Sequence, residues 1–311
     1  MMLPKEGDYF AKDGTAFKAL DVVNTEAATP AKQTIENIIY SSGMGLPKLH
    51  QLEEFKKEKS EPIALIGGGP SIKTQLDKIK EFKIRVACGS VHDYLAENNI
   101  YCEYATVCDP DPISANYLQY SNKYTKYLVS TGCDKSVFDT LEGNKVYTWN
   151  CYSEELAKIQ RELDKDDFRA IGGGCTVGLR SLSIALMLGY MDIHFFGFDS
   201  CLDVDNTHHA YDFSDKSEEL GYLYKVRIGT NERMNQEKEF TCVGYHIAQA
   251  QHYKDFYIRY NKYYRATFHG EGMLQELVKT ISKEEQKYKV KFGYEDRALE
   301  SLALKPNGSI V

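Results

Sequence analysis

The sequence predicts an α/β protein whose core is a doubly wound, mostly parallel β-sheet with flanking helices. Short apolar runs alternate with segments of helical length from residue 62 to about residue 200. Small or polar residues follow the end of most apolar runs, and two glycine clusters each precede a helical segment. Such alternation is typical of parallel strands, because the connecting helices cover both faces of the sheet.

The expected elements follow one another in a regular order. A helix that begins at Pro30 is expected in the N-terminal part. Strands are expected at residues 63–66, 84–88, 104–108, 127–130, 145–149, 193–197 and 264–268, and helices at residues 71–82, 91–98, 154–164, 177–188, 247–260 and 273–282. After residue 199 the alternation stops, and a long polar segment predicts a lid-like insertion at about residues 200–240.

The chain of 311 residues is long enough for one large α/β domain with additions at both ends. We expect residues 1–60 to form an N-terminal preface that packs on the main domain. Residues 61–280 are expected to form a nucleotide-binding α/β catalytic domain, and residues 281–311 a charged C-terminal tail.

Composition argues against several classes of protein. The formal net charge of −7 does not support a broad nucleic-acid-binding surface. A nucleic-acid base as a substrate is chemically allowed, but the charge gives it no support. The eight cysteines are scattered without a CxxC pair, which argues against zinc or iron–sulfur sites and for free thiols. We find no signal-peptide core and no apolar run of membrane-spanning length, and therefore expect a cytoplasmic protein. The sequence does not decide whether the protein forms a homo-oligomer.

The first glycine cluster, Gly67, Gly68 and Gly69, follows an apolar strand and is continued by Pro70 and Ser71. Glycines let the backbone approach an anion, and the N–H groups and dipole of a following helix favour negative charge. The pattern predicts a phosphate cradle, with Ser71 as helix cap or ligand. It matches neither GxGxxG nor a P-loop, and the alternative is a tight turn that binds nothing.

The second cluster, Gly173, Gly174, Cys175 and Thr176, opens an apolar helix and predicts a second cradle. Close helix–strand packing is the alternative reason for its glycines. Further small or polar residues follow other strands, namely Gly89, Ser90 and Asp199. The carboxyl ends of parallel strands share one edge of a sheet, so these residues predict a ligand crevice there. Asp199 could orient a ribose or acceptor hydroxyl, or cap a loop.

Asp109 and Asp111 also follow a strand, one residue apart. Two carboxylates so spaced can hold Mg²⁺ or Mn²⁺ against a diphosphate, because these cations prefer oxygen ligands. The alternative is a turn in which aspartate precedes proline, a common composition.

Three histidines are candidates for a general base, because the pKa of imidazole suits proton transfer near neutral pH. His208 and His209 lie in the polar segment after residue 199, and His246 precedes an aromatic helix. A surface or core role is the alternative for each. Aromatic rings and cations crowd residues 253–265, and their spacing favours a core-facing helix over a stacking surface.

Residues 63–72 resemble the opening motif aGxGPSL of two related families. One is the MptE-like family, named for archaeal 6-hydroxymethyl-dihydropterin pyrophosphokinase and including Maf flagellin glycosyltransferases; the other comprises bacterial lipooligosaccharide sialyltransferases. Residues 172–199 resemble their second block, a small-residue turn and a helix ending ALxLGYKEIxLxGxD. His208-His209-Ala210 resembles the HA that follows it in many MptE-like proteins. The resemblance runs from about residue 45 to residue 275.

The resemblance implies a Rossmann-like sheet of the GT-A or sialyltransferase type, with a nucleotide at the strand ends. The nucleotide is a UDP-, GDP- or CMP-linked sugar in one branch and ATP in the other. In the sialyltransferases the second turn touches the nucleotide and carries a serine, where Cys175-Thr176 stand here. His209 matches the MptE-like pattern, whereas His246 is the position that aligns with the sialyltransferase base. CMP-dependent sialyltransferases need no metal, so Asp109 and Asp111 favour a diphosphate or triphosphate donor.

Three functions therefore stand as hypotheses. The first is a glycosyltransferase that moves a sugar from a nucleotide-activated donor to an acceptor hydroxyl. The second is an ATP-dependent pyrophosphokinase of a hydroxymethyl pterin-like substrate. The third is a nucleotide-binding module without turnover. The acceptor, whether glycan, protein, small molecule or nucleic-acid base, cannot be read from the sequence.

Overall fold

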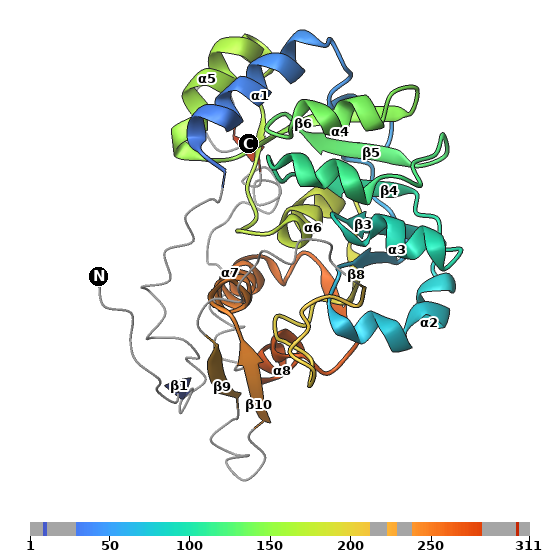
Figure 1. Cartoon of the computed structure of the whole chain (residues 1–311), viewed down its shortest axis with the longest axis vertical. Helices are drawn as coiled ribbons and strands as arrows, with labels where there is room; N and C mark the ends of the chain where they lie inside the picture. The colour runs from blue at the N-terminus through green and yellow to red at the C-terminus, as the bar shows by residue number, and fades with distance from the viewer. Residues whose placement is uncertain (1–8, 11–28, 212–222, 229–237, 282–302, 305–311) are drawn as a thin grey trace.

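A computed structural model describes residues 9–10, 29–211, 223–228, 238–281 and 303–304 (Figure 1). Its centre is a nine-stranded sheet in the order β11-β8-β2-β3-β4-β5-β6-β7-β12. All neighbours are parallel except β12, which runs antiparallel to β7. The strands are β2 (Ile63–Ile66), β3 (Ile84–Cys88), β4 (Tyr104–Val107), β5 (Lys126–Ser130), β6 (Lys145–Cys151), β7 (Ala170–Ile171), β8 (Asp192–Phe196), β11 (Arg265–Phe268) and β12 (Ala303–Leu304). The predicted doubly wound, mostly parallel sheet is confirmed.

The direction of winding reverses at β2. From β2 the chain adds β3 to β7 on one side, and it then returns to place β8 and β11 on the other side of β2. Such a reversal is a topological switch point, and its neighbouring strand ends diverge to leave a crevice. The crevice therefore lies beyond Ile66 and Phe196, next to the predicted site residues of segment 67–71 and Asp199.

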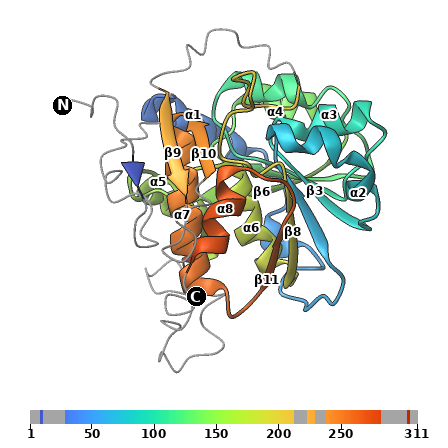
Figure 2. The same cartoon turned by 90° about the horizontal axis from the view of Figure 1, so that it is seen from below.

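Helices cover both faces of the sheet (Figure 2). Alternate side chains of a strand point to opposite faces, so Ile63 and Leu65 pack in one core cluster and Ala64 and Ile66 in the other. The first cluster includes residues of α6 (Val177–Met187), α7 (Gly244–Tyr260) and α8 (Met273–Thr280). The second includes residues of α2 (Leu76–Lys80), α3 (Val91–Glu97) and α4 (Lys135–Thr140). At one end of the sheet, α1 (Ala31–Gly43) packs on α5 (Glu154–Asp164).

A second, three-stranded sheet consists of β1 (Tyr9–Phe10), β9 (Tyr224–Ile228) and β10 (Lys238–Cys242), at the lower end of the molecule in Figure 1. Strand β9 and the start of β10 lie inside the range predicted as a lid-like loop. Their sequences alternate polar and apolar residues, and only Val226, Ile228 and Cys242 enter the core. Because only one face of each strand is buried, the sequence of the segment is largely polar.

Several predicted regions fall on residues that the structure does not describe. Within the predicted lid these are residues 212–222 and 229–237, so the lid stays a prediction. The same holds for the preface, where residues 1–8 and 11–28 lie outside the described part, and for the tail, where residues 282–302 and 305–311 do. Among the described helices, none combines the length and apolar composition that crossing a bilayer requires. All eight cysteines are free thiols.

Candidate functional site

A cavity of about 160 Å³ lies at the carboxyl ends of β2, β3 and β8, at the switch point of the sheet. We call it the histidine cleft. It brings together many of the predicted site residues, namely Gly67, Gly68, Gly69, Ser90, Thr176, Asp199, His208, His209 and His246. Segments far apart in sequence therefore meet at the edge that the strand-end pattern predicted.

The first glycine turn is held against β8. The N–H groups of Gly67 and Gly69 donate to the carbonyl oxygens of Phe196 and Gly197, at 2.8 and 2.9 Å. A Cβ atom on Gly67 would lie 2.7 Å from the Gly197 oxygen, and one on Gly69 would lie 2.5 Å from Asp199 Oδ2. Close packing thus accounts for both glycines, and their N–H groups are already engaged within the chain.

The segment after this turn differs from the prediction. In place of a helix at residues 71–82, a 3₁₀ helix spans Pro70–Thr74 and the short helix α2 spans Leu76–Lys80. The Ser71 N–H group donates to Asp199 Oδ2 at 2.8 Å. Ser71 lines a neighbouring groove and lies outside the lining of the histidine cleft. A short 3₁₀ helix offers a smaller aligned dipole than the predicted helix would, so this turn is the weaker of the two cradles.

The second predicted cradle presents a regular helix N-terminus to the histidine cleft. Thr176 caps α6, its Oγ1 accepting from the Leu179 N–H at 3.3 Å, and the first turn carries no acidic residue. Thr176, Val177 and Gly178 all line the cleft. Gln249 of α7 donates to Thr176 Oγ1 at 3.3 Å and so ties the cap to the facing helix. The N-terminus of an 11-residue helix favours an anion at this point.

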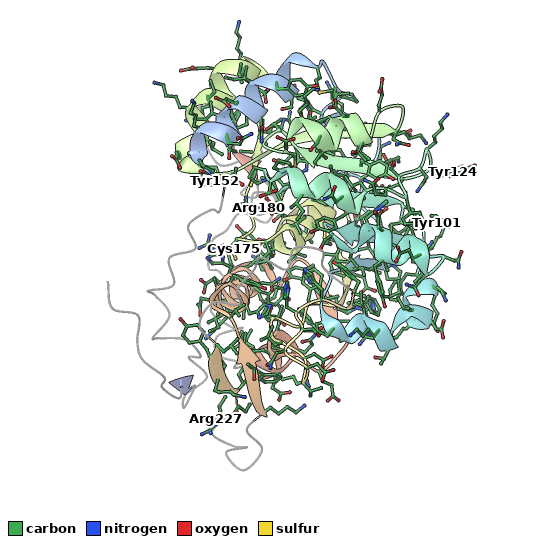
Figure 3. The ribbon with its side chains drawn as sticks, viewed as in Figure 1. Tyr101, Tyr124, Tyr152, Cys175, Arg180 and Arg227 are labelled. Atoms are coloured by element: carbon green, nitrogen blue, oxygen red, sulfur yellow. The ribbon has the colours of Figure 1, made fainter. Side chains whose placement is uncertain are left out.

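The rest of the second cluster faces elsewhere. Gly173 and Gly174 line a separate open basin beside α7, and Cys175 is exposed to solvent. Figure 3 shows Cys175 and Arg180 on the same side of the molecule as Tyr152. Arg180 of α6 donates to the carbonyl oxygens of Ile171 and Tyr152, which fastens the helix to the ends of β6 and β7. Gly89, after β3, packs against Val177 just outside the cleft lining.

The three histidines form one cluster. The ring centroids of His208 and His209 lie 4.1 Å apart, and those of His208 and His246 lie 6.5 Å apart. Burial lowers the pKa of His209 to about 4 and that of His246 to about 3. The rings of His209 and His246 are therefore neutral at pH 7, the form that can accept a proton.

Hydrogen bonds distinguish the tautomers of two of these rings. Nδ1 of His209 lies 3.1 Å from the carbonyl oxygen of His208, so we assign it as a donor, which leaves the ring lone pair on Nε2. Nδ1 of His246 accepts from the Val243 N–H at 3.4 Å, so Nε2 of His246 carries the proton. This assignment gives His209 the geometry of a base and makes His246 a cap of α7.

Asp199 is 4% exposed and joins two elements. Its Oδ2 accepts from the Ser71 N–H, and its Oδ1 accepts from Gln275 Nε2 of α8 at 3.2 Å. Burial raises the pKa of this carboxyl, although the bonds from Ser71 and Gln275 oppose the rise. The next residue, Ser200, has φ +52°, a left-handed conformation that is uncommon outside glycine and clusters at functional sites.

Asp109 and Asp111 lie outside the lining of the histidine cleft. Asp109 Oδ1 accepts from the Asp111 N–H at 3.0 Å, and Asp111 Oδ1 accepts from the Ile113 N–H at 2.9 Å. They thus cap the turn and the 3₁₀ helix Pro112–Tyr117, and burial raises the pKa of Asp109. Within the described ranges, no group of three or more histidine, cysteine, aspartate or glutamate residues could hold a metal ion.

Sequence reasoning missed several residues around the cleft. Tyr245 and Gln249 line it from the first turns of α7, and Ser200 donates to Gln249 Oε1 at 2.8 Å. Helical spacing from His246 could have identified Gln249, which lies three residues further along the same face. Tyr211 packs on His209 at a ring-centroid distance of 5.1 Å, and its residue type alone carried no signal.

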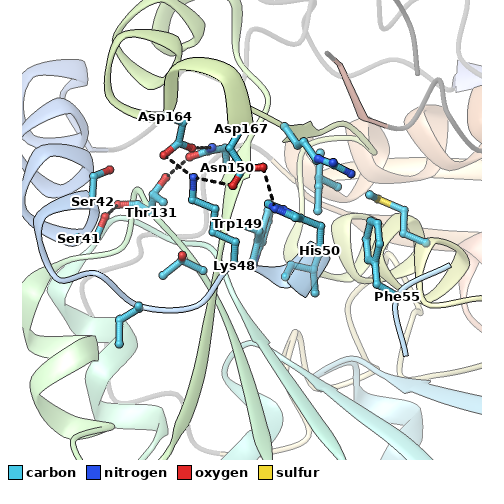
Figure 4. Close-up of a pocket in the computed structure, with 16 residues that line it drawn as sticks. Ser41, Ser42, Lys48, His50, Phe55, Thr131, Trp149, Asn150, Asp164 and Asp167 are labelled. Carbon is cyan, nitrogen blue, oxygen red and sulfur yellow. Dashed lines mark hydrogen bonds and ion pairs between the residues drawn. The ribbon is translucent and has the colours of Figure 1, made fainter. Parts of the chain in front are cut away.

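Another enclosed space, the polar cavity, measures about 50 Å³ and lies between α5, β6 and the segment before β2 (Figure 4). Lys48 Nζ lies 3.0 Å from Asp164 and 3.3 Å from Asp167. Asn150 donates to Asp164 at 2.6 Å, and His50 lies 3.0 Å from Asp167. The paired charges of this cavity indicate a structural network.

Comparisons with known proteins identify the family and the fold of the chain. A profile of the family described as "6-hydroxymethylpterin diphosphokinase MptE-like" matches residues 32–205. No curated protein matches the chain in sequence. A Maf glycosyltransferase from Magnetospirillum magneticum AMB-1 has a similar structure, with a TM-score of 0.58, 15% identity and 83% of this chain covered. The chain spans only 42% of that protein.

Two sialyltransferase structures are more distant. A mammalian sialyltransferase in complex with Gal-beta-1-3GalNAc-ortho-nitrophenol has a TM-score of 0.37 at 10% identity, over 61% of this chain and 72% of the other. The sialyltransferase CstII from Campylobacter jejuni, in complex with a substrate analogue, cytidine-5'-monophosphate, has a TM-score of 0.30 at 16% identity, over 52% and 70%. The likeness to the Maf enzyme shows the fold, and the profile match covers more than half of the sequence. The chain therefore belongs to the MptE-like family.

Proposed function

We propose that the protein transfers a sugar from a nucleotide-activated donor to an acceptor hydroxyl in the histidine cleft. The observation that carries this proposal is the pairing of neutral, buried His209 with the N-terminus of α6 in one cavity at the switch point. A base and an anion-binding helix end are the two groups that glycosyl transfer with inversion needs. The base acts on the acceptor, and the helix end stabilises the departing phosphate.

The acceptor oxygen forms a bond to the anomeric carbon of the sugar while the bond from that carbon to the phosphate oxygen breaks. The electron pair of the broken bond leaves with the phosphate, which lies near the N–H groups of Val177 and Gly178. Nε2 of His209 takes the proton of the acceptor hydroxyl. General-base assistance of this kind contributes ~10²–10⁴-fold in rate.

The charge of the histidine cleft affects which nucleotide-linked donor it would bind best. Among the described residues that line it, none is a lysine or arginine. A diphosphate brings more negative charge than a helix N-terminus compensates, whereas a single phosphodiester needs less. We therefore rank CMP-linked donors above UDP- and GDP-linked donors, which revises the order that Asp109 and Asp111 favoured in the sequence.

A Mg²⁺ or Mn²⁺ ion at Asp109 and Asp111 is expected only if the donor is a UDP- or GDP-linked sugar or ATP. Each carboxylate accepts a backbone hydrogen bond of its own turn, so a metal would have to share or replace these bonds. The double variant Asp109→Ala/Asp111→Ala tests this site. Unchanged activity and unchanged metal dependence would remove the metal from the proposal.

An assay with each donor class tests the proposed function. The protein is incubated with CMP-, UDP- and GDP-sugars and with ATP, each with and without Mn²⁺, and the released nucleotide is measured. Release of CMP that His209→Gln abolishes supports the proposal. His252→Gln is the matched control, because His252 is exposed on α7 outside the cleft lining. Binding of a nucleotide without turnover would indicate a non-catalytic module.

A second candidate function follows from the family description, which names 6-hydroxymethylpterin diphosphokinase. In that case ATP occupies the cleft and a hydroxymethyl heterocycle attacks its β-phosphorus. The oxygen–phosphorus bond to the acceptor forms, AMP leaves with the electron pair, and His209 takes the hydroxyl proton. Formation of AMP from ATP in the same assay, dependent on a hydroxymethyl pterin, would favour this function over sugar transfer.

A further inference from the structure

We propose that Tyr211 is a positioning residue, which holds the imidazole of His209 in the orientation needed for proton transfer and is itself anchored by Ser90. This inference rests on the proposed function, because it takes His209 as the base. The contact between Tyr211 and Ser90 joins a segment without regular structure to the end of the central strand β3. It identifies what fixes the base relative to the sheet.

His209 needs such support because its own segment provides little. Residues 202–211 form neither helix nor strand. The carbonyl oxygen of His208 accepts from Nδ1 of His209, and the Gly68 backbone also bonds the ring, so packing adds to these contacts in setting the tilt of the ring plane. The backbone is tied to the first glycine turn by the Ala210 N–H, which donates to the Gly68 oxygen at 2.9 Å. The side chain therefore depends on its packing partners as well.

Tyr211 is the partner that links the His209 ring to the sheet. The two rings stack with centroids 5.1 Å apart and an angle of 20° between their planes. The Tyr211 hydroxyl lies 2.6 Å from Ser90 Oγ, a hydrogen bond between residues 121 positions apart in the chain. Ser90 is the N-cap residue of α3, two residues after the end of β3, so this hydrogen bond fixes Tyr211 relative to a central strand.

The surroundings of Tyr211 leave little room for the pair to shift. A Cβ atom on Gly68 would lie 2.5 Å from the Tyr211 hydroxyl oxygen and 3.2 Å from His209 Nδ1. Tyr94 of α3 also packs on Tyr211, with ring centroids 5.2 Å apart. Burial raises the pKa of Tyr211, so its hydroxyl stays protonated at neutral pH and either hydroxyl of the pair can donate. Gly68 is thus explained as the glycine that admits this pair.

The stack on Tyr211 matters for the rate because a base acts only when it is held in the right geometry. A base misplaced by about 1 Å loses ~10²-fold in rate, because proton transfer and attack must occur together. Tyr211 would therefore act on the rate constant kcat and leave substrate binding largely unchanged.

Kinetics of four variants test the role. Tyr211→Leu removes the stack and is expected to lower kcat by ~10²-fold with KM for the donor nearly unchanged. Tyr211→Phe keeps the ring, loses only the hydroxyl and is expected to lower kcat by ~10-fold or less. Ser90→Ala should match Tyr211→Phe, and the double variant should lose no more than either, because both changes remove one hydrogen bond. Tyr124→Phe is the control, since it removes the same group from a tyrosine that is exposed to solvent and does not line the cleft.

A second measurement needs no substrate and therefore separates this inference from the proposed function. Histidine side-chain NMR, with His209 assigned through His209→Gln, reports the tautomer and pKa of the ring. We expect the Nδ1–H tautomer and a low pKa in the native protein and in Tyr211→Phe. In Tyr211→Leu we expect a mixture of tautomers and a pKa closer to 6.5. If Tyr211→Leu left tautomer and pKa as in the native protein, the positioning role would be wrong, whether or not any sugar transfer is detected.

Discussion

The histidine cleft and the polar cavity both gather polar side chains inside one domain, but they treat charge differently. In the polar cavity Lys48 meets two carboxylates, and Asn150 links Asp164 to Thr131 through bonds of 2.6 and 2.8 Å. In the histidine cleft, none of the described lining residues is a lysine or arginine, and burial holds His209 and His246 neutral.

This difference separates a structural network from a site. In the polar cavity Lys48, Asn150 and Asp164 already bond one another, so their removal should affect stability. Neutral histidines lie beside a helix N-terminus in the histidine cleft, and an anion bound there would raise their pKa and strengthen both interactions. The predictions below test that contrast.

The largest effect is expected at His209. His209→Gln should lower turnover by ~10²–10⁴-fold, because the variant cannot take the acceptor proton. His246→Gln should lower it less, since His246 caps α7. Steady-state kinetics and circular dichroism melting on the same samples check both points. Equal losses in the two variants would contradict the tautomer assignment.

The next effect concerns the polar cavity. Asp164→Ala should lower the free energy of unfolding by ~2–3 kcal/mol, because Lys48 and Asn150 lose their shared partner in a largely buried setting. Turnover per folded molecule should stay near the native value. Urea unfolding measures the change, with Asp167→Asn as a milder comparison at a carboxylate that is 44% exposed. A variant that stayed stable and lost activity would make the polar cavity part of the site.

Acid should destabilise the fold through the histidine cleft. The pKa of His209 is about 4 and that of His246 about 3 in the folded state, against an unfolded value near 6.5, so the unfolded chain binds more protons below that pH. The stability contributed by these neutral rings is fully present above pH 6.5 and is lost as pH falls towards 4. Within that window, each ring should lower the free energy of unfolding by ~1.4 kcal/mol for each unit by which the pH falls. The melting temperature measured from pH 7.5 to 4.5 should fall less steeply in His209→Gln.

The smallest effect is expected at the helix cap. Thr176→Ala removes the bond to the Leu179 N–H and should cost ~1 kcal/mol in stability. It should also raise the KM for the donor, because the α6 N-terminus becomes less ordered beside the phosphate. Thr176→Ser restores the hydroxyl and should recover both quantities. A donor KM that is the same in all three proteins would place the phosphate away from α6.

Much of the fold could be predicted because its signals are local. Ile63–Ile66 and Asp192–Phe196 are apolar runs of strand length, and period and length identify such runs without tertiary information. The helix predicted at residues 71–82 was wrong because Pro70 begins a 3₁₀ turn that docks on Asp199, a contact over 128 positions. Strands β9 and β10 were hidden because only one face of each is buried.

The candidate site also has residues that could be predicted from the sequence and residues that could not. Its glycines and histidines could be predicted because residue type and position after a strand are visible in the sequence. The pairing of Tyr211 with Ser90, and the capping bonds of Asp109 and Asp111, depend on neighbours that only the folded chain supplies. For the two aspartates the same residue pattern fits a metal site and a turn, and hydrogen-bond geometry is what distinguishes them.

The position of β2 at the switch point has a consequence for synthesis of the chain. Ser71 and Asp199 bond across 128 residues, so the ribosome takes ~6–26 s to deliver the second partner after the first. During that interval one side of β2 lacks β8, and its unpaired backbone groups are open to other chains. The part of the molecule that we assign to function is thus completed only after β2 to β8 have been synthesised, and nascent chains that end before residue 192 should be prone to aggregate.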